Sequence, residues 1–238
     1  MSLKKYKGLA TKTVRYNLKI IFAGKFFWFL LAAFSFFAFF MFQQAWNREE
    51  INEGSIYNLL LFPCLLLIFY PVVFGIQNDE DNRILEIIFG IPNYRYKIWG
   101  IRMLMVYVAN YFILILFAYV ARLLLYPVNI FEMAAQLIFP MLFFGNLAFL
   151  FSTITRSGNG TAVIMIILGL VFFLFMNTGD TIGNTFWNVF LNPFSTPRDI
   201  HPTIWQDTIL KSRMFLLISG IVWLMLGLLN LQKREKFV

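Results

Sequence analysis

The chain of 238 residues has little of the chemistry that most catalytic and metal sites need. It contains one cysteine, Cys64, and one histidine, His201. A single cysteine cannot form a disulfide within the chain, and together with one histidine it cannot supply the ligands of a structural zinc site. The motifs Gly-x-Ser-x-Gly and His-Glu-x-x-His are also missing from the sequence. We therefore expect this chain to be no enzyme and to hold no cofactor or metal.

Charged residues are scarce as well. They make up 13% of the chain, against 60% hydrophobic residues and a mean hydropathy of +0.71, whereas a soluble domain has about 25% charged residues. So much apolar surface indicates that lipid is part of the solvent of this protein. The formal net charge of +8 does not indicate a nucleic-acid partner, because the basic residues lie in short segments between apolar runs, as topology signals do.

Six apolar runs are free of charged side chains and long enough to cross a hydrocarbon core of ~30 Å as helices. They are residues 26–45, 57–76, 103–121, 133–155, 161–179 and 214–232. Residues 180–207 are too rich in Asn, Gly and Pro for a further span, and we predict a re-entrant or interfacial segment there, anchored at headgroup level by Trp187. The predicted fold is an all-α integral membrane protein in which residues 1–238 form one transmembrane domain.

The distribution of basic residues predicts the orientation of this domain. With six spans and the N-terminus inside, fifteen Lys and Arg fall on the inner side and five on the outer side. Inner segments of membrane proteins carry such an excess of positive charge. We therefore expect a multi-pass protein of the cytoplasmic membrane with both termini in the cytoplasm.

Residues 1–25 are predicted to form an interfacial helix ahead of the first span. Lys12, Arg15 and Lys19 recur at helical spacing on one face, and apolar side chains fall on the opposite face. A helix of this kind lies in the headgroup region with its basic face toward anionic lipids. The alternative is a basic flank that anchors the first span without a defined helix.

The connection between the second and third predicted spans carries a cluster of charges. A short amphipathic helix is predicted over residues 79–89, capped by Asn78 or Asp79 and stopped by Gly90 and Pro92. Its isoleucines share one face, and its polar side chains form a charged side that faces the cytoplasm. The charged residues of this region are Asp79, Glu80, Asp81, Arg83 and Glu86.

This region resembles the coupling helix of the membrane subunits of ABC-2 type exporters, where an acidic helix runs into Gly-x-Pro-x-x-Arg. The matching turn here is Gly90, Pro92 and Arg95, followed by Gly100 and Arg102. The resemblance implies an elbow helix at residues 1–25, and a coupling helix that docks on a separate ABC ATPase through Asp79, Glu80, Asp81, Arg83 and Glu86. It also implies pairing with a second permease. The chain has no Gly-x-x-x-x-Gly-Lys-Ser/Thr loop, so ATP and magnesium are expected on the partner.

Three other classes of function remain open at this stage. A channel or ion-coupled transporter is disfavoured because the six runs contain no ionisable acid or base. A membrane scaffold or assembly factor is a further alternative. A magnesium-dependent prenyltransferase would use an Asp-rich motif such as Asp79–Asp81, but no second motif follows on the same side. The abundant Phe and Met favour a hydrophobic or amphipathic cargo, such as a lipid, a peptide or a drug.

Overall fold

The computed structural model describes residues 26–47, 51–81, 83, 84, 88, 90, 94–176, 184–197 and 200–232. Within these ranges every regular element is a helix, and no strand occurs. The elements are α2 (Phe26–Asn47), α3 (Glu53–Val73), α4 (Gly75–Asp81), the π-helix η1 (Arg95–Gly100), α6 (Ile101–Leu124), α7 (Ile130–Thr155), α8 (Gly158–Met176) and α10 (Pro202–Asn230). The predicted elbow helix, with Lys12, Arg15 and Lys19, lies outside the described residues.

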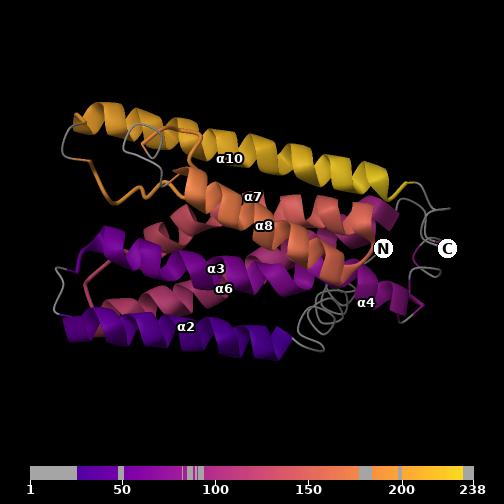
Figure 1. The fold of residues 1–238 in the computed structure, drawn as a ribbon, viewed down its shortest axis with the longest axis horizontal. Helices are drawn as coiled ribbons and strands as arrows, with labels where there is room; N and C mark the ends of the chain where they lie inside the picture. The colour runs from indigo at the N-terminus through magenta and orange to yellow at the C-terminus, as the bar shows by residue number, and fades with distance from the viewer. Residues whose placement is uncertain are drawn as a thin grey trace, which may run out of the picture.

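Successive long helices alternate in direction, so that α2 begins and α10 ends at the same end of the bundle (Figure 1). We call this the α4 end and the opposite one the Pro202 end. Helices α2, α3, α7 and α10 pack side by side as a row, because α2 contacts α3, α3 contacts α7, and α7 contacts α10. Helix α8 lies in front of this row and α6 behind it in Figure 1. The central pair α3 and α7 is therefore covered on most sides by protein.

Side-chain caps set the starts of three of these helices at the Pro202 end. Asn52 accepts a hydrogen bond from the Ser55 amide ahead of α3 (2.9 Å), and Asn129 does the same for α7. His201 caps α10 and is followed by a proline in the first turn. Each cap satisfies an amide that the helix itself leaves unpaired. The apolar sequences between these caps then propagate as helix.

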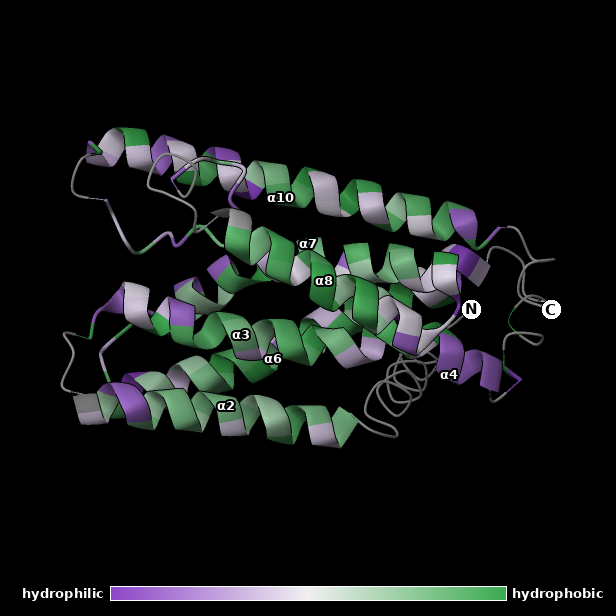
Figure 2. Ribbon diagram, viewed as in Figure 1, coloured by the Kyte–Doolittle hydropathy of each residue, from purple (hydrophilic) through white to green (hydrophobic). Residues whose placement is uncertain are grey.

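Five of the helical segments are long and apolar enough to cross a membrane. They are Phe26–Trp46, Glu53–Asp81, Arg95–Leu124, Ile130–Thr155 and Pro202–Asn230. Figure 2 shows their middle sections as hydrophobic and the polar residues gathered toward the two ends, most clearly in α4. Large apolar side chains on α2, α6, α8 and α10 point outward, as lipid-facing residues do. This confirms the prediction of an all-helical chain and indicates a multi-pass membrane protein.

The fifth predicted span, 161–179, coincides over its described part with α8. Its described apolar stretch is Gly158–Leu174. The last predicted span, 214–232, is part of a longer helix, because α10 already begins at Pro202. The charged residues of α10 made the predicted run begin later than the helix does. In the helix, Asp207 and Lys211 form an ion pair of 2.6 Å one turn apart.

The segment before α10 was predicted to be re-entrant over residues 180–207. Its described part, 184–197, is a series of turns, and Pro202 and the residues that follow belong to α10. Asn192 holds the turns against the start of α3, because its side-chain amide donates to the Gly54 carbonyl (2.8 Å) and to Asn58 (3.0 Å). The segment thus packs on the bundle at the Pro202 end.

Candidate functional site

The charged residues of the predicted coupling region lie at the α4 end. Helix α3 ends at Val73, a single turn residue follows, and α4 continues in helical geometry to Asp81. The Asn78 amide donates to the Phe74 carbonyl (2.9 Å). The prediction that Asn78 or Asp79 caps a new helix is therefore wrong, because both residues lie in the second half of a helix that began at Gly75. The fall in hydropathy after Ile76 marked the end of the apolar run, not the start of a helix.

Asp79 does not belong to an exposed face. Its side chain is 3% exposed, and its carboxylate accepts a charge-assisted hydrogen bond from Arg102 (2.6 Å), whose side chain is 5% exposed. The expectation that Asp79 contributes to a docking surface is thus wrong in this conformation. The physical reason is the position of α6: its first turn places Arg102 beside α4, and a buried carboxylate needs such a partner.

Aromatic rings surround this ion pair. The Arg102 guanidinium lies 4.5 Å from the centre of the Trp99 ring, and Trp99 packs against Phe149 of α7 with ring centres 5.9 Å apart. Trp99 is itself buried. The rings exclude water from the ion pair, which strengthens the attraction between its charges. The pair therefore fixes α4 to the start of α6.

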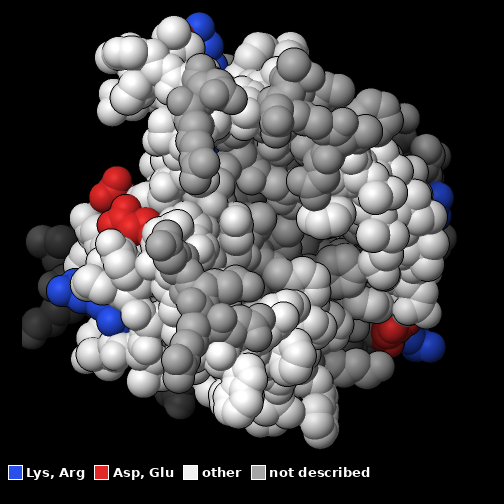
Figure 3. Space-filling view, turned by 60° about the vertical axis from the view of Figure 1, so that its left-hand side comes forward, with Lys and Arg blue, Asp and Glu red and all other residues white. Residues whose placement is uncertain are grey.

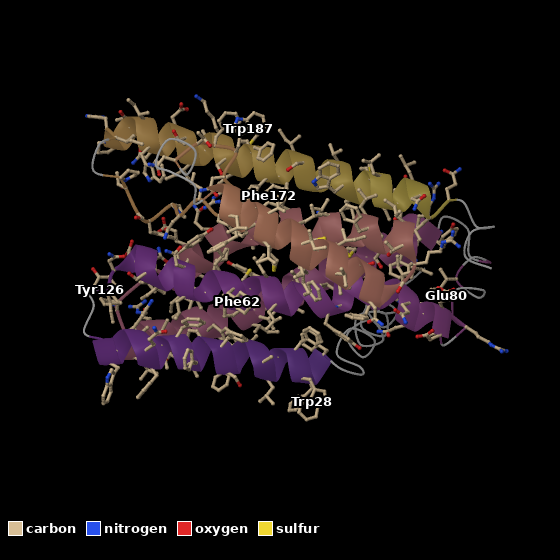
Figure 4. The ribbon with its side chains drawn as sticks, in the orientation of Figure 1. Trp28, Phe62, Glu80, Tyr126, Phe172 and Trp187 are labelled. Carbon is tan, nitrogen blue, oxygen red and sulfur yellow. The ribbon has the colours of Figure 1, made fainter. Side chains whose placement is uncertain are left out.

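Other charged residues of the region point outward. Glu80, Asp81 and Arg83 are exposed, and Figure 4 shows Glu80 at the tip of the molecule beside α4. The Arg83 amide donates to the Glu80 carbonyl (2.9 Å), and Arg83 has a left-handed backbone with φ of 53°. This turn ends α4 and leaves two acids and one base together on the surface. We call Glu80, Asp81 and Arg83 the charged turn.

The rest of the predicted docking and turn residues are described in part. Gly90 is exposed, and Arg95 is half-buried at the start of η1. Glu86 and Pro92 lie outside the described residues. The structure thus brings three of the predicted docking residues together and removes Asp79 from the surface.

The segment after the charged turn is tied to the end of α10. The Tyr94 hydroxyl donates to the Leu231 carbonyl (2.5 Å), and the Arg95 guanidinium donates to the Gln232 side chain (3.1 Å). These residues are 137 positions apart in the chain. They connect the charged region directly with the last helix.

A third connection reaches α8. The Gly158 amide at the start of α8 donates to the side chain of Gln77 in α4 (2.5 Å). A Cβ at Gly158 would overlap the ring of Phe74 and come within 2.7 Å of the Gln77 oxygen, so only glycine allows this approach. Polar contacts therefore join α4 to α6 through Asp79 and to α8 through Gln77. Tyr94 and Arg95 join the start of η1 to the end of α10.

The described residues offer little to a metal ion at this end. No three Asp, Glu, His or Cys side chains in the described part of the chain are grouped as metal ligands. Asp79, the first residue of the Asp-rich motif that a prenyltransferase would need, is bound to Arg102. The described residues of the α4 end thus present a small charged surface.

Trp187, predicted as a membrane-interface anchor, lies toward the other end of the molecule. It is 53% exposed, and its ring packs on Phe186 (4.4 Å between ring centres) and edge-on against Phe215 of α10 (4.9 Å). Figure 4 shows it beside the first half of α10. An exposed, amphipathic ring near the polar end of a long apolar helix has the position that interface tryptophans take.

The partner of Asp79 is not evident from the sequence. The sequence places Arg102 after the coupling-region turn as a further basic residue, whereas in the structure it is the buried half of an ion pair. A lone Arg at the edge of an apolar run, with acidic residues earlier on the same side, was the available signal, because ionisable groups at such positions pair with one another.

Comparison of the chain with protein-family models, curated proteins and solved structures finds no match.

Proposed function

We propose that this chain is the membrane-embedded permease subunit of an ATP-driven exporter of the ABC-2 type. It moves a hydrophobic or amphipathic molecule, such as a lipid, a peptide or a drug, across the cytoplasmic membrane. ATP and magnesium are bound by a separate ATPase subunit, and a second permease copy or a related permease completes the pathway. In this proposal α8 spans the membrane in addition to the five long helices, and the α4 end faces the cytoplasm.

The observation that carries the proposal is the mounting of the charged turn. Glu80, Asp81 and Arg83 are exposed at one end of an otherwise apolar bundle, and the helix that leads to them, α4, is joined to α6 by the Asp79–Arg102 pair and to α8 by Gln77. A surface that only kept the loop soluble would need no such base. A surface that receives a push from an ATPase and passes it to several helices requires one.

The basic residues favour the same orientation. The described part of the α4 end (Figure 1) carries several basic residues, in its turns and at the starts of its helices. They are Arg83, Arg95, Lys97, Arg102 and Arg156. Loops with such an excess of Lys and Arg stay in the cytoplasm, where the ATPase would be. A channel or a scaffold is the alternative if no ATPase binds.

Co-purification with an ATPase tests the proposal. The chain is co-expressed with the ABC ATPase encoded nearest to its gene and reconstituted in nanodiscs. Complex formation and ATP hydrolysis are then measured for the wild type and for the triple variant Glu80→Gln, Asp81→Asn, Arg83→Gln. We expect stimulated ATP hydrolysis in the wild-type complex. The triple variant should bind the ATPase about tenfold more weakly than wild type, which corresponds to ~1.4 kcal/mol spread over three surface charges.

The matched control removes charges at the other end. Asp207→Asn with Lys211→Met deletes an exposed ion pair and should leave ATPase binding unchanged, because it faces the opposite side of the membrane. Asp79 is kept in both variants, since its loss would disturb the fold. If the wild-type chain binds no ATPase, or if the charged-turn variant binds as well as wild type, the permease proposal or its docking surface is wrong.

A further inference from the structure

A buried arginine lies near the Pro202 end, far from the charged turn. Arg213 of α10 is 5% exposed. It directly precedes the charge-free run 214–232, so it stands at the border between the apolar part of α10 and its polar start. The space-filling view of Figure 3, in which the Pro202 end comes forward, shows a largely uncharged surface with a few separate charged groups. Arg213 is a charge beneath this surface, not on it.

Its contacts come from three different parts of the chain, and all are neutral. The Nε of Arg213 donates to the Gln136 side chain of α7 (2.8 Å). Its Nη2 donates to the Leu191 carbonyl (3.1 Å) and toward the Tyr57 hydroxyl of α3 (3.4 Å). The guanidinium also lies 5.6 Å from the ring centre of Phe139. These groups position the cation, but none of them neutralises it.

The remaining nitrogen of the guanidinium, Nη1, lacks a hydrogen-bond partner in the described part of the chain. It is buried, and within the same residues Arg213 forms no ion pair. Arg102, the other buried arginine, has Asp79 at 2.6 Å. An isolated buried charge costs several kcal/mol even after relaxation, so a site of this kind is incomplete without an anion.

We propose that Arg213 is the recognition residue of a binding site for an anionic headgroup, a phosphate or a carboxylate carried by an amphiphile. The two N–H groups of Nη1 suit the oxygens of either group. The position at the border of the apolar run suits a molecule with a charged head and an apolar tail. The anion completes the coordination that Gln136, Leu191 and Tyr57 begin.

Access to this site depends on the turns of residues 184–197. Leu191 covers the guanidinium from this segment, and the neighbouring Ser212 hydroxyl is 3.5 Å from the Asn188 carbonyl. The headgroup therefore enters when the segment lifts from α10. An apolar groove of about 830 Å³ also runs along α10 beside Trp187, but the cation on its wall, Lys211, is already paired with Asp207. Of these two cations, Arg213 is the one left without a counter-ion.

This inference deepens the proposed function, because it would make an anionic amphiphile the cargo or a fixed lipid of the permease. It is nevertheless tested on the chain alone, without an ATPase. A failure of ATPase binding and a failure of this site are therefore separate results.

The experiment measures the unfolding temperature in nanodiscs of phosphatidylcholine with increasing phosphatidylglycerol. We expect the wild type to gain about 4 °C as the anionic lipid is added. Arg213→Gln should lose this gain, while in pure phosphatidylcholine it is at least as stable as wild type because the unpaired charge is gone. Arg213→Lys should retain part of the gain. Native mass spectrometry should show phosphatidylglycerol retained by wild type and lost from Arg213→Gln.

A second arm distinguishes the source of the anion. Inorganic phosphate added to wild type in pure phosphatidylcholine raises the unfolding temperature only if a soluble anion reaches the site. A gain with phosphatidylglycerol alone assigns the site to a lipid headgroup. Either gain, lost in Arg213→Gln, supports the proposal.

The controls address the other charges nearby. Lys211→Gln removes an exposed cation of the same helix and should leave the lipid gain unchanged. Asp180→Asn with Asp199→Asn removes two acids of the preceding connection that lie outside the described residues, and it too should leave the gain unchanged. The proposal is overturned if wild type shows no gain with either anion, if Arg213→Gln keeps the full gain, or if the double Asp variant abolishes it.

Discussion

Breaking the Asp79–Arg102 pair should destabilise the protein far more than deleting an exposed acid one residue away. The two side chains are 3% and 5% exposed and 2.6 Å apart. Removal of one partner leaves the other buried and unpaired, which costs about 3–5 kcal/mol. We therefore expect Asp79→Leu and Arg102→Met each to lower the free energy of unfolding by at least ~3 kcal/mol. Glu80→Gln, on the exposed side of the same helix, should change it by about 0.5 kcal/mol or less.

The double variant separates pairing from burial. Asp79→Leu with Arg102→Met replaces both charges by apolar groups, and such a replacement is often neutral or even stabilising. The coupling energy from the double-mutant cycle should be about 2 kcal/mol or more. Arg102 also contacts the Trp99 ring, but Met keeps much of that apolar contact.

The assay is reversible unfolding of the chain in mixed micelles, followed by tryptophan fluorescence. Trp99 packs directly beside the pair and reports on its surroundings. If the double variant loses as much stability as the two single variants added together, the charges do not interact, and our account of the α4 end is refuted.

Two further substitutions test the close packing of the helices. Gly158→Ala should lower the free energy of unfolding by about 1–3 kcal/mol, because its Cβ meets the Phe74 ring. Gly169→Ala on the same helix has open space and should be neutral or stabilising by up to ~1 kcal/mol. Thermal unfolding of both variants gives the comparison, and equal effects would contradict it. Tyr107→Phe removes a hydrogen bond of 2.6 Å to Asn146 between α6 and α7. It should cost about 0.6–1.7 kcal/mol, measured in the same way, and an unchanged midpoint would show that the bond contributes nothing.

Much of the helical arrangement could be predicted from hydropathy and charge alone. Each uncharged run predicted a helix that the structure describes, because in lipid an apolar segment must pair its own backbone groups. The ends were predicted less well. Helix α10 starts at Pro202 because a cap, a proline and an internal ion pair extend it beyond the apolar run, and none of these features is visible in hydropathy.

The contacts of the candidate site could not be predicted from the sequence. Asp79 was assigned to the exposed side from helical spacing, yet which side of α4 is buried depends on the position of α6, 23 residues later. Arg213 meets Gln136 across 77 residues for the same reason. Spacing along one helix gives relative directions on that helix. The neighbours that occupy those directions are decided by packing of distant segments.

The length of α10 has a consequence for the surrounding bilayer. At 1.5 Å per residue, its 29 residues extend over about 43 Å, which exceeds a hydrocarbon layer of ~30 Å. Helix α10 meets this mismatch by tilt or by projection of its polar start, which carries the exposed Asp207–Lys211 pair, beyond the hydrocarbon layer. A thinner membrane increases the length of helix that must be accommodated in this way.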